Sequence, residues 1–354
     1  MKKLANLFFV AFLFILIIPS LTLKQTDNSN CENRSLTASL DFSFSQEFFK
    51  DFETFYIDHL GFKTYLTTLN ASLKYLIFNS SSHPQFAVTG KNNWAFYTDN
   101  TDRILDSYSH QDLLTQDSLE SLRLKWEKRK SDLKAMGIDF YIAVYPNKST
   151  IYNNNVPFNM KWTKRDTCSK LNQVINHFKL KSSPIEIIQF KNELMAQKDT
   201  IDNYLKFDTH WNDLGCFTAY QKLCKSIQIN PHSLSDLNLT HELFKNPDLG
   251  RLSGLCNSKL SLYSTPIINY KDSKLDFPKD TAIDFITCWK NPDLTKTKTL
   301  LVFMDSYTNN MEKLLALHFK ECYFVPRNYY IEIIQETNPD IVIIANVERY
   351  FATE

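Results

Sequence analysis

The chain has 354 residues, of which 43% are hydrophobic, so it can bury a sizeable core in one or two domains. Forty basic and 39 acidic side chains leave a formal net charge of +1, which gives no electrostatic basis for binding nucleic acid. The chain contains 6 glycines and no glycine-rich nucleotide-binding loop, so most of it is expected in regular secondary structure.

The first segment has the features of a membrane anchor. Lys2 and Lys3 precede an uncharged run from Leu4 to Leu23, and about 20 apolar residues in a helix span the roughly 30 Å core of a bilayer. A cleaved signal peptide is the alternative, but no Ala-x-Ala site follows the run. We predict an anchor or signal segment over residues 1–24 with a cytoplasmic N-terminus, a linker over 25–42, and an exported domain over 43–354.

Helical and strand patterns alternate along the rest of the chain. Aromatic residues at helical spacing predict one or two helices over 44–79, with Asp58 and His59 as a structural pair, and residues 86–97 predict a hairpin. Residues 230–298 have no regular pattern. Further helices are expected over 109–137, 169–180, 192–196, 213–229, 310–318 and 329–337, and strands over 138–145, 185–190, 299–304, 321–325 and 340–346. This alternation favours an α/β fold with a mostly parallel sheet.

Two short stretches carry the side chains of a nucleophilic catalyst. Asp208 and His210 are two residues apart, and a carboxylate this close can orient an imidazole as a general base. Ser306 follows the apolar strand 300–303 and precedes a helical pattern, which predicts an exposed hydroxyl at a strand-to-helix turn. A serine that only caps a helix is the structural alternative.

Other residues are candidates for substrate contacts, and they are Asn147, Lys148, Trp211, Tyr307 and Arg251. The first two follow a predicted strand, and loops at the carboxyl ends of parallel strands line ligand crevices. Trp211 follows the candidate base His210, and Tyr307 follows the candidate nucleophile Ser306. The arginine lies in loop 248–254, where it would suit a polar glycan or an anionic group. A plain turn, a core aromatic residue and a surface arginine are equally good explanations.

The cysteines and histidines predict neither a metal site nor a cofactor. The 7 cysteines are an odd number, so at least one is unpaired, and their connectivity cannot be read from the sequence. Cys216 and Cys224 lie about 12 Å apart on one predicted helix, too far to be bridged. No C-x-x-C pair occurs, and a metal site using His210 with Cys216 lacks a second pair of ligands.

Seven segments, taken in order, are similar to the motifs of one family. They are Cys31–Leu36, Asp51–Lys63, Gly90–Tyr97, Tyr145–Lys148, Asp208–Asn212, Met304–Tyr307 and Asn338–Tyr350. The set resembles the SGNH-hydrolase-like domain of the alginate O-acetyltransferases AlgX and AlgJ and the related DHHW proteins, over about residues 31–351. Two positions depart from the motifs: Met304 stands in place of a glycine, and Lys63 in place of an arginine.

The resemblance implies an SGNH-hydrolase-like three-layer sandwich in which Ser306 is the nucleophile, His210 the base and Asp208 its orienting acid. It also implies transfer of acetyl to a polysaccharide hydroxyl outside the cytoplasm, with a membrane-bound O-acyltransferase as the partner that delivers acetyl. The backbone N–H of Ser306 is the expected oxyanion donor. Two alternatives stay open: an acetylesterase with the same three residues, and a non-catalytic glycan-binding or assembly protein, which Met304 would favour.

Overall fold

The computed structural model describes residues 2–22, 31, 36–37, 46–245, 247–269, 286–326 and 328–352. The chain divides into two compact units. One comprises Met1–Ala87 and Lys245–Leu262, and the other Val88–Phe244 and Tyr263–Glu354. The predicted linker over residues 25–42 lies, except for residues 31 and 36–37, outside the described part of the chain.

The first unit is helical where it is described. The carboxylate of Asp58 accepts hydrogen bonds from the N–H and the hydroxyl of Thr37 (3.0 and 3.1 Å) and lies 3.9 Å from the ammonium of Lys63. His59 bonds through Nδ1 to the carbonyl of Phe55 at 2.8 Å. Asp58 and His59 thus make local structural contacts, as predicted. The described helices of this unit include α1 (Lys2–Leu21), α3 (Gln46–His59), α4 (Lys63–Phe78) and α12 (Asp248–Leu252).

The prediction of a transmembrane anchor is not supported. The N-terminal run does form a helix, but α1 ends at Leu21, two residues before the predicted end of the span at Leu23. Across the described residues, no helix combines the length and the apolar character needed to span a membrane.

The second unit is built on a six-stranded sheet with the strand order β4-β3-β10-β8-β9-β7. Every neighbouring pair is parallel except the edge strand β7, which runs antiparallel to β9. The predicted strand–helix alternation at the C-terminal end is confirmed by β8, α13, β9, α14 and β10. The strands are β3 (Asp139–Tyr145), β4 (Ile187–Gln189), β7 (Thr287–Lys290), β8 (Thr299–Met304), β9 (Glu321–Pro326) and β10 (Ile341–Val347).

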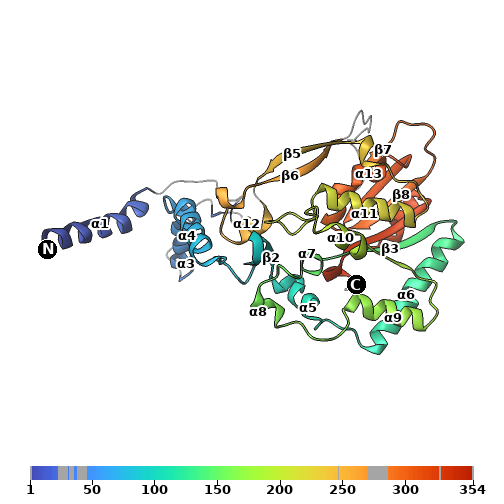
Figure 1. Cartoon of the computed structure of the whole chain (residues 1–354), viewed down its shortest axis with the longest axis horizontal. Coiled ribbons are helices and arrows are strands. Elements are labelled where there is room, and N and C mark those ends of the chain that lie inside the picture. The colour runs from blue at the N-terminus through green and yellow to red at the C-terminus, as the bar shows by residue number, and fades with distance from the viewer. Residues whose placement is uncertain are drawn as a thin grey trace. The chain divides into compact units, whose positions relative to one another are not determined.

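Helices cover both faces of this sheet (Figure 1). In β8, Leu300 and Val302 belong to the apolar core on one face, and Leu301 and Phe303 to the core on the other, because successive side chains of a strand alternate. Helices α7 (Lys148–Ile151), α10 (Lys191–Gln197), α11 (Asp213–Ser226) and α13 (Glu312–Ala316) contribute to the first core. Helices α6 (Gln116–Ala135), α9 (Lys170–Leu180) and α14 (Ile331–Thr337) contribute to the second. The predicted three-layer α/β sandwich is confirmed.

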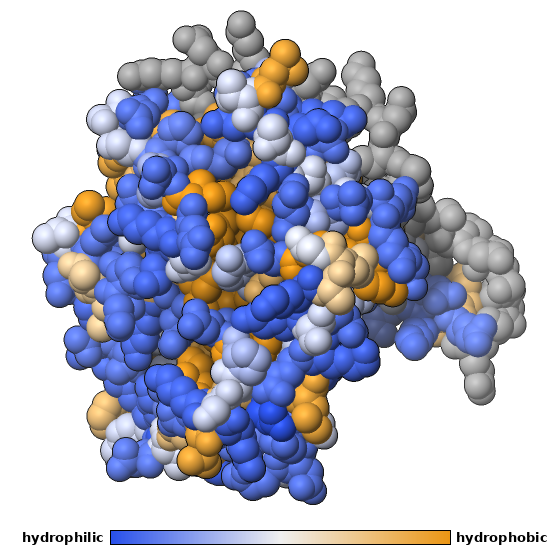
Figure 2. Space-filling view, turned by 90° about the vertical axis from the view of Figure 1, so that its right-hand side faces the viewer, coloured by the Kyte–Doolittle hydropathy of each residue, from blue (hydrophilic) through white to orange (hydrophobic). Residues whose placement is uncertain are grey.

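Several shorter elements complete the second unit. The predicted hairpin over 86–97 is present as β1 (Ala87–Thr89) and β2 (Ala95–Tyr97), and α5 (Ile104–Ser109) and α8 (Phe158–Lys161) follow. The antiparallel pair β5 (Asn238–Phe244) and β6 (Tyr263–Asn269) was not predicted, since nearly every residue of β5 is exposed and it shows no buried face. On the face seen in Figure 2, hydrophilic side chains predominate and hydrophobic ones form separate groups.

Candidate active site

One imidazole joins the three predicted catalytic residues. His210 Nδ1 lies 2.8 Å from Oδ1 of Asp208, and His210 Nε2 lies 2.8 Å from Oγ of Ser306. The carboxylate side chain is 9% exposed and the imidazole 30% exposed, whereas Ser306 is exposed. A buried acid, a half-buried base and an exposed hydroxyl therefore form one hydrogen-bonded series, the arrangement needed to activate a serine.

The loop that carries the acid and the base is held in place before α11 begins. The backbone N–H of His210 donates to Oδ1 of Asp208 (3.0 Å), so the same carboxylate oxygen contacts both the backbone and the ring of the histidine. Trp211 pairs with Tyr204 in an isolated antiparallel bridge. Asn212 then caps α11, because its side chain accepts from the N–H of Gly215 at 2.9 Å.

The buried side chain of Lys148 supports this loop. Its ammonium donates to the carbonyl oxygens of Leu205, Lys206 and Asp208 at 2.7, 2.8 and 2.9 Å. An ammonium has three N–H donors, so these three contacts use its full capacity. Lys148, which the sequence analysis named as a candidate substrate contact, is 5% exposed, and its ammonium supports the Asp208 loop.

The turn that carries Ser306 is fixed by the residue before it. Asp305, which is buried, accepts from the N–H of Tyr307 through Oδ1 (3.0 Å) and from the N–H of Val347 through Oδ2 (2.6 Å). These bonds join the end of β8 to the end of β10. Burial raises the pKa of Asp305, and the two N–H donors act in the opposite direction. The sequence analysis did not assign this role to Asp305.

The aromatic neighbours of the site are also structural. The Tyr307 hydroxyl donates to the carbonyl of Thr209 (2.6 Å), and the Trp211 indole donates to the carbonyl of Tyr307 (3.0 Å). Asn147 accepts from the guanidinium of Arg349 at 3.2 Å. Trp211, Tyr307 and Asn147 are at most 2% exposed. Trp211 and Tyr307 thus join the nucleophile turn to the histidine loop, and all three residues offer almost no surface to a polymer in this conformation.

Two further residues from the sequence analysis can be located. Arg251 lies in α12, which belongs to the first compact unit. Met304 ends β8 with 6% exposure and is not among the residues with positive φ. The backbone at this position therefore does not require the conformational freedom of glycine, and the methionine side chain packs into the core.

The sandwich fold defines the class of the molecule as SGNH-hydrolase-like. Residues 87–260 match the family model described as "SGNH hydrolase-like domain, acetyltransferase AlgX", so the predicted resemblance is confirmed over this region. The match includes Asp208 and His210, and Ser306 lies beyond it. No curated protein sequence matches the chain.

Two solved structures share the fold of this chain, and a third has a lower TM-score. A DHHW family protein from Eubacterium siraeum has a TM-score of 0.54 at 14% identity, over 76% of this chain and 91% of that one. Bacillus cereus PatB1 has a TM-score of 0.53 at 16% identity, over 76% of this chain and 98% of that one. The O-acetyltransferase domain of Pseudomonas putida AlgJ has a TM-score of 0.47 at 15% identity, over 76% and 93%. At these identities the likeness of the first two concerns the fold alone.

Proposed function

We propose that this chain is an O-acetyltransferase that works outside the cytoplasm and moves an acetyl group through Ser306 to a hydroxyl of a polysaccharide. The observation that carries the proposal is the imidazole of His210, which lies 2.8 Å from the carboxylate of Asp208 on one side and 2.8 Å from the hydroxyl of Ser306 on the other. The match of residues 87–260 to the model of an AlgX-type acetyltransferase domain supports acetyl as the group transferred.

In the acylation step, Ser306 Oγ attacks the carbonyl carbon of an acetyl ester while His210 Nε2 takes the hydroxyl proton. The carbonyl π electrons move to oxygen, giving an oxyanion that needs hydrogen-bond donors. The backbone N–H of Ser306 begins the helical turn Ser306–Met311 and is one such donor. Collapse of the tetrahedral intermediate expels the alcohol of the donor, which receives the proton from His210. Asp208 holds the imidazole and balances its positive charge.

In the second step, a sugar hydroxyl is the nucleophile and the acetyl-serine is the acetyl donor. The imidazole removes a proton from the acceptor hydroxyl, its oxygen attacks the acetyl-serine, and Ser306 leaves with the proton returned by His210. No cofactor or metal enters either step. The acetyl donor is proposed to be delivered by a membrane-bound O-acyltransferase partner.

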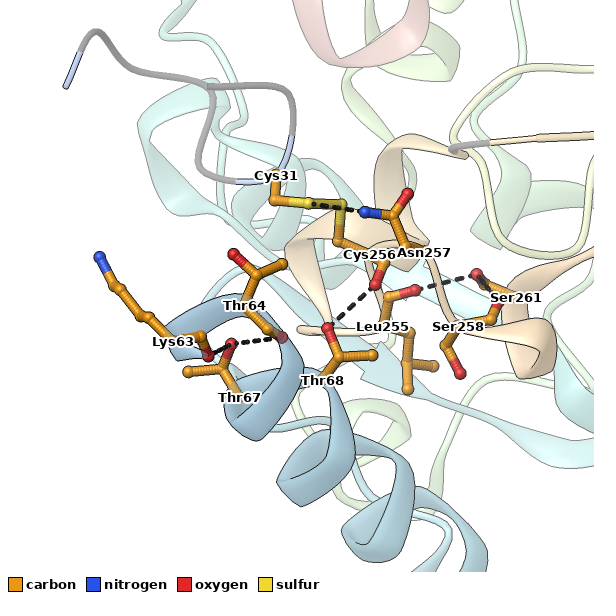
Figure 3. The surroundings of a disulfide bond; sticks show 10 residues. All are labelled: Cys31, Lys63, Thr64, Thr67, Thr68, Leu255, Cys256, Asn257, Ser258 and Ser261. Carbon is orange, nitrogen blue, oxygen red and sulfur yellow. Dashed lines mark hydrogen bonds between the residues drawn. A yellow bond between two sulfur atoms is a disulfide. The ribbon is translucent and has the colours of Figure 1, made fainter. Parts of the chain in front are cut away.

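A disulfide supports a location outside the cytoplasm. Cys31 and Cys256 are bonded with 5.5 Å between their Cα atoms, and Figure 3 shows Asn257 and Thr68 beside the bond, with the Thr68 hydroxyl donating to the carbonyl of Cys256 at 3.0 Å. The bond closes a loop of 225 residues. Stable disulfides are typical of exported proteins and rare in reducing compartments.

The exposure of Ser306 favours one second candidate, a carbohydrate acetylesterase with the same three residues. Water reaches an exposed acetyl-serine directly and would act as the acceptor in place of a sugar. Transfer and hydrolysis therefore differ only in which hydroxyl reacts with the acyl-enzyme.

The test is a covalent trapping experiment on the full chain. We expect a chromogenic acetyl ester to release its alcohol and to leave an acetyl adduct on Ser306, detected by mass spectrometry of peptides. Ser306→Ala should remove both the release and the adduct. The matched control is Ser235→Ala, which changes another exposed serine of the same unit. If a folded Ser306→Ala variant kept the adduct and the turnover, the proposed nucleophile would be wrong.

Adding candidate polysaccharides to the acetylated protein then separates the two activities. Faster loss of the adduct with appearance of acetylated glycan supports the transferase. Loss to free acetate at a rate that no glycan changes supports the esterase.

A further inference from the structure

A pocket separate from the Ser306 site lies at the same end of the central sheet, where the strands reach their carboxyl ends. It is lined by residues that follow β3 and β4, by Glu348 after β10, and by the first turn of α9. Its cavity has a volume of about 160 Å³, and it does not include Asp208, His210 or Ser306. Strands are spaced by about 4.8 Å, so the ends of β3 and β4 lie roughly 10 and 14 Å from the end of β8.

The walls of this pocket carry an excess of positive charge. Three lysines line it, Lys164, Lys170 and Lys191, together with the half-buried His110. Lys170 is 4% exposed and is neutralised by Asp112, at 3.0 Å. The other two lysines are exposed, and among the described residues no carboxylate lies within 4.0 Å of either ammonium. Two cations thus remain without an ion pair at the mouth of one pocket.

The two lysines and His110 affect one another electrostatically. Burial lowers the pKa of Lys164, the charge of Lys191 lowers it further, and the carboxylate of Glu348 acts in the opposite direction. The pKa of His110 is lowered by burial first, and also by Lys164 and Lys191. The one carboxylate lining the pocket, Glu348, already accepts from the N–H of Asn147 and the hydroxyl of Thr150. Like charges held close together raise the free energy of the empty pocket, and a bound anion would remove that cost.

The backbone adds to this preference for negative charge. Helix α9 has 11 residues, and its first turn, Lys170–Asn172, lines the pocket. The N-terminal end of a helix carries a partial positive charge. Hydroxyl groups of Ser107 and Thr167 lie around the same cavity as donors for oxygen atoms, whereas the Thr150 hydroxyl donates to Glu348.

We propose that this pocket binds a small anionic group, either a carboxylate or a phosphate, between Lys164, Lys191 and the first turn of α9. The site is separate from the Ser306 site, and its existence does not depend on Ser306 being catalytic. Its ligand would lie two to three strands away from the nucleophile along the same sheet edge, so the two sites can be occupied together.

Cys168 provides a direct reporter of this pocket. It lines the cavity and is exposed, whereas the other free cysteines, Cys216, Cys224, Cys288 and Cys322, are buried. Titration of the full chain with inorganic phosphate, and separately with glucuronate, should slow the reaction of Cys168 with a thiol-specific disulfide reagent. Glucose serves as the uncharged control, and total ionic strength is kept constant because it screens exposed charges. Calorimetry with the same compounds gives an independent binding constant.

Substitution of the unpaired lysines completes the test. Lys164→Gln and Lys191→Gln should each weaken anion binding roughly threefold, and the double variant roughly tenfold, because each removes one partly screened charge. Lys179→Gln makes the same change at an exposed position of α9 that does not line the pocket, and it should bind like the parent. Protection is compared with and without anion within each variant, which cancels changes in the intrinsic reactivity of Cys168.

Protection by phosphate alone identifies a phosphate site, and protection by glucuronate alone a carboxylate site. Protection by both with the same loss in the double variant supports the shared anion site. If neither compound protects Cys168 or produces binding heat, or if Lys179→Gln weakens binding as much as the double variant, the proposal is overturned. Anion binding is measured without acetyl ester, and acetyl-ester turnover of the parent chain is measured separately, so failure here is distinguishable from failure of the proposed acetyltransferase activity.

Discussion

Two histidines of the sheet-containing unit each contact a hydroxyl through Nε2, and their surroundings give them opposite properties. His210 Nε2 lies 2.8 Å from the exposed Ser306 hydroxyl and has the carboxylate of Asp208 behind its other nitrogen. His318 Nε2 lies 2.5 Å from the hydroxyl of Tyr220, which is fully buried. Burial lowers the pKa of His318 to about 4, and His232 and Lys296 lower it further.

The difference lies in what each imidazole can do with a proton. A carboxylate on the far nitrogen stabilises the imidazolium that forms when the near nitrogen removes a proton, so His210 suits a general base. His318 has no such support, and its partner hydroxyl also accepts from the N–H of His232 at 2.8 Å inside the core. A histidine–hydroxyl contact is therefore not a catalytic site by itself. The carboxylate of Asp208 behind the ring and the exposure of the Ser306 hydroxyl are the features that support the proposed catalytic role of the His210 contact.

The largest effect is expected when the base itself is removed. His210→Ala leaves Ser306 without a proton acceptor, so the rate of acetyl-ester cleavage should fall by about 10³-fold or more. The stability should change little, because the imidazole is 30% exposed. Steady-state kinetics and the yield of the acetyl adduct provide the measurement. A rate within tenfold of the parent would mean that another group activates the serine.

Removal of the acid should have a smaller but still large effect. Asp208→Asn keeps the shape of the side chain and loses its negative charge, so kcat should fall by about 10²–10⁴-fold with little change in KM. The matched change Asp202→Asn affects an exposed carboxylate of the same segment and should leave kcat within twofold. Equal effects of the two changes would show that Asp208 does not orient the histidine.

Lys148 supplies the third prediction, which concerns positioning. Lys148→Met removes the donors to three carbonyl oxygens and lets the Asp208 loop shift. We expect kcat to fall about 10–100-fold with KM nearly unchanged, and the free energy of unfolding to fall by about 2–3 kcal/mol. Lys148→Gln keeps part of the donor capacity and should fall between Lys148→Met and the parent.

Lys206→Met is the control for this change. Lys206 belongs to the same loop, and its side chain is 37% exposed and pairs with Asp202 at 3.4 Å, so its loss should affect neither kcat nor stability strongly. A rise in KM with kcat unchanged in Lys148→Met would instead restore the interpretation of Lys148 as a substrate contact.

The sheet could be predicted from the sequence because its physical signal is local. Residues 300–303 form an uninterrupted apolar run, and every residue of β8 is buried, so the predicted strand over 299–304 agrees with the structure. The edge pair β5 and β6 gave no such signal, since β5 is exposed along almost its whole length. A strand that is buried on both faces can be recognised in the sequence as an apolar run, whereas an exposed strand gives no such pattern.

The candidate site was only partly predictable for the same reason. The chemical types of Asp208, His210 and Ser306 indicate their roles, but the contact between His210 and Ser306 joins residues 96 positions apart. It depends on the Asp305 bond to β10 and on three carbonyl groups that converge on Lys148. A lysine after a strand is usually solvated, and only the folded backbone reveals that this one is enclosed.

The smallest expected effect concerns His318 and the pH dependence of the stability. In the unfolded chain the pKa of a histidine is about 6.5, and in the folded chain that of His318 is lowered to about 4. The unfolded state therefore binds a proton first as the pH falls. The stability that His318 contributes is present above pH 6.5 and is lost between pH 6.5 and 4.

For a fully buried histidine, such a pKa shift would correspond to a loss of about 3 kcal/mol in the free energy of unfolding. A loss of about 1–2 kcal/mol is expected here, because His318 is only half-buried and partly screened. Urea unfolding midpoints at pH 7 and pH 4.5 measure the loss. His318→Gln keeps an acceptor for the Tyr220 hydroxyl but cannot titrate, so its loss between the two pH values should be smaller than that of the parent. Its acetyl-ester turnover at pH 7 should stay within twofold, in contrast to His210→Ala. The same pH dependence in parent and variant would show that His318 does not titrate differently in the fold. The contrast between the two histidines would then rest on the acid behind His210 alone.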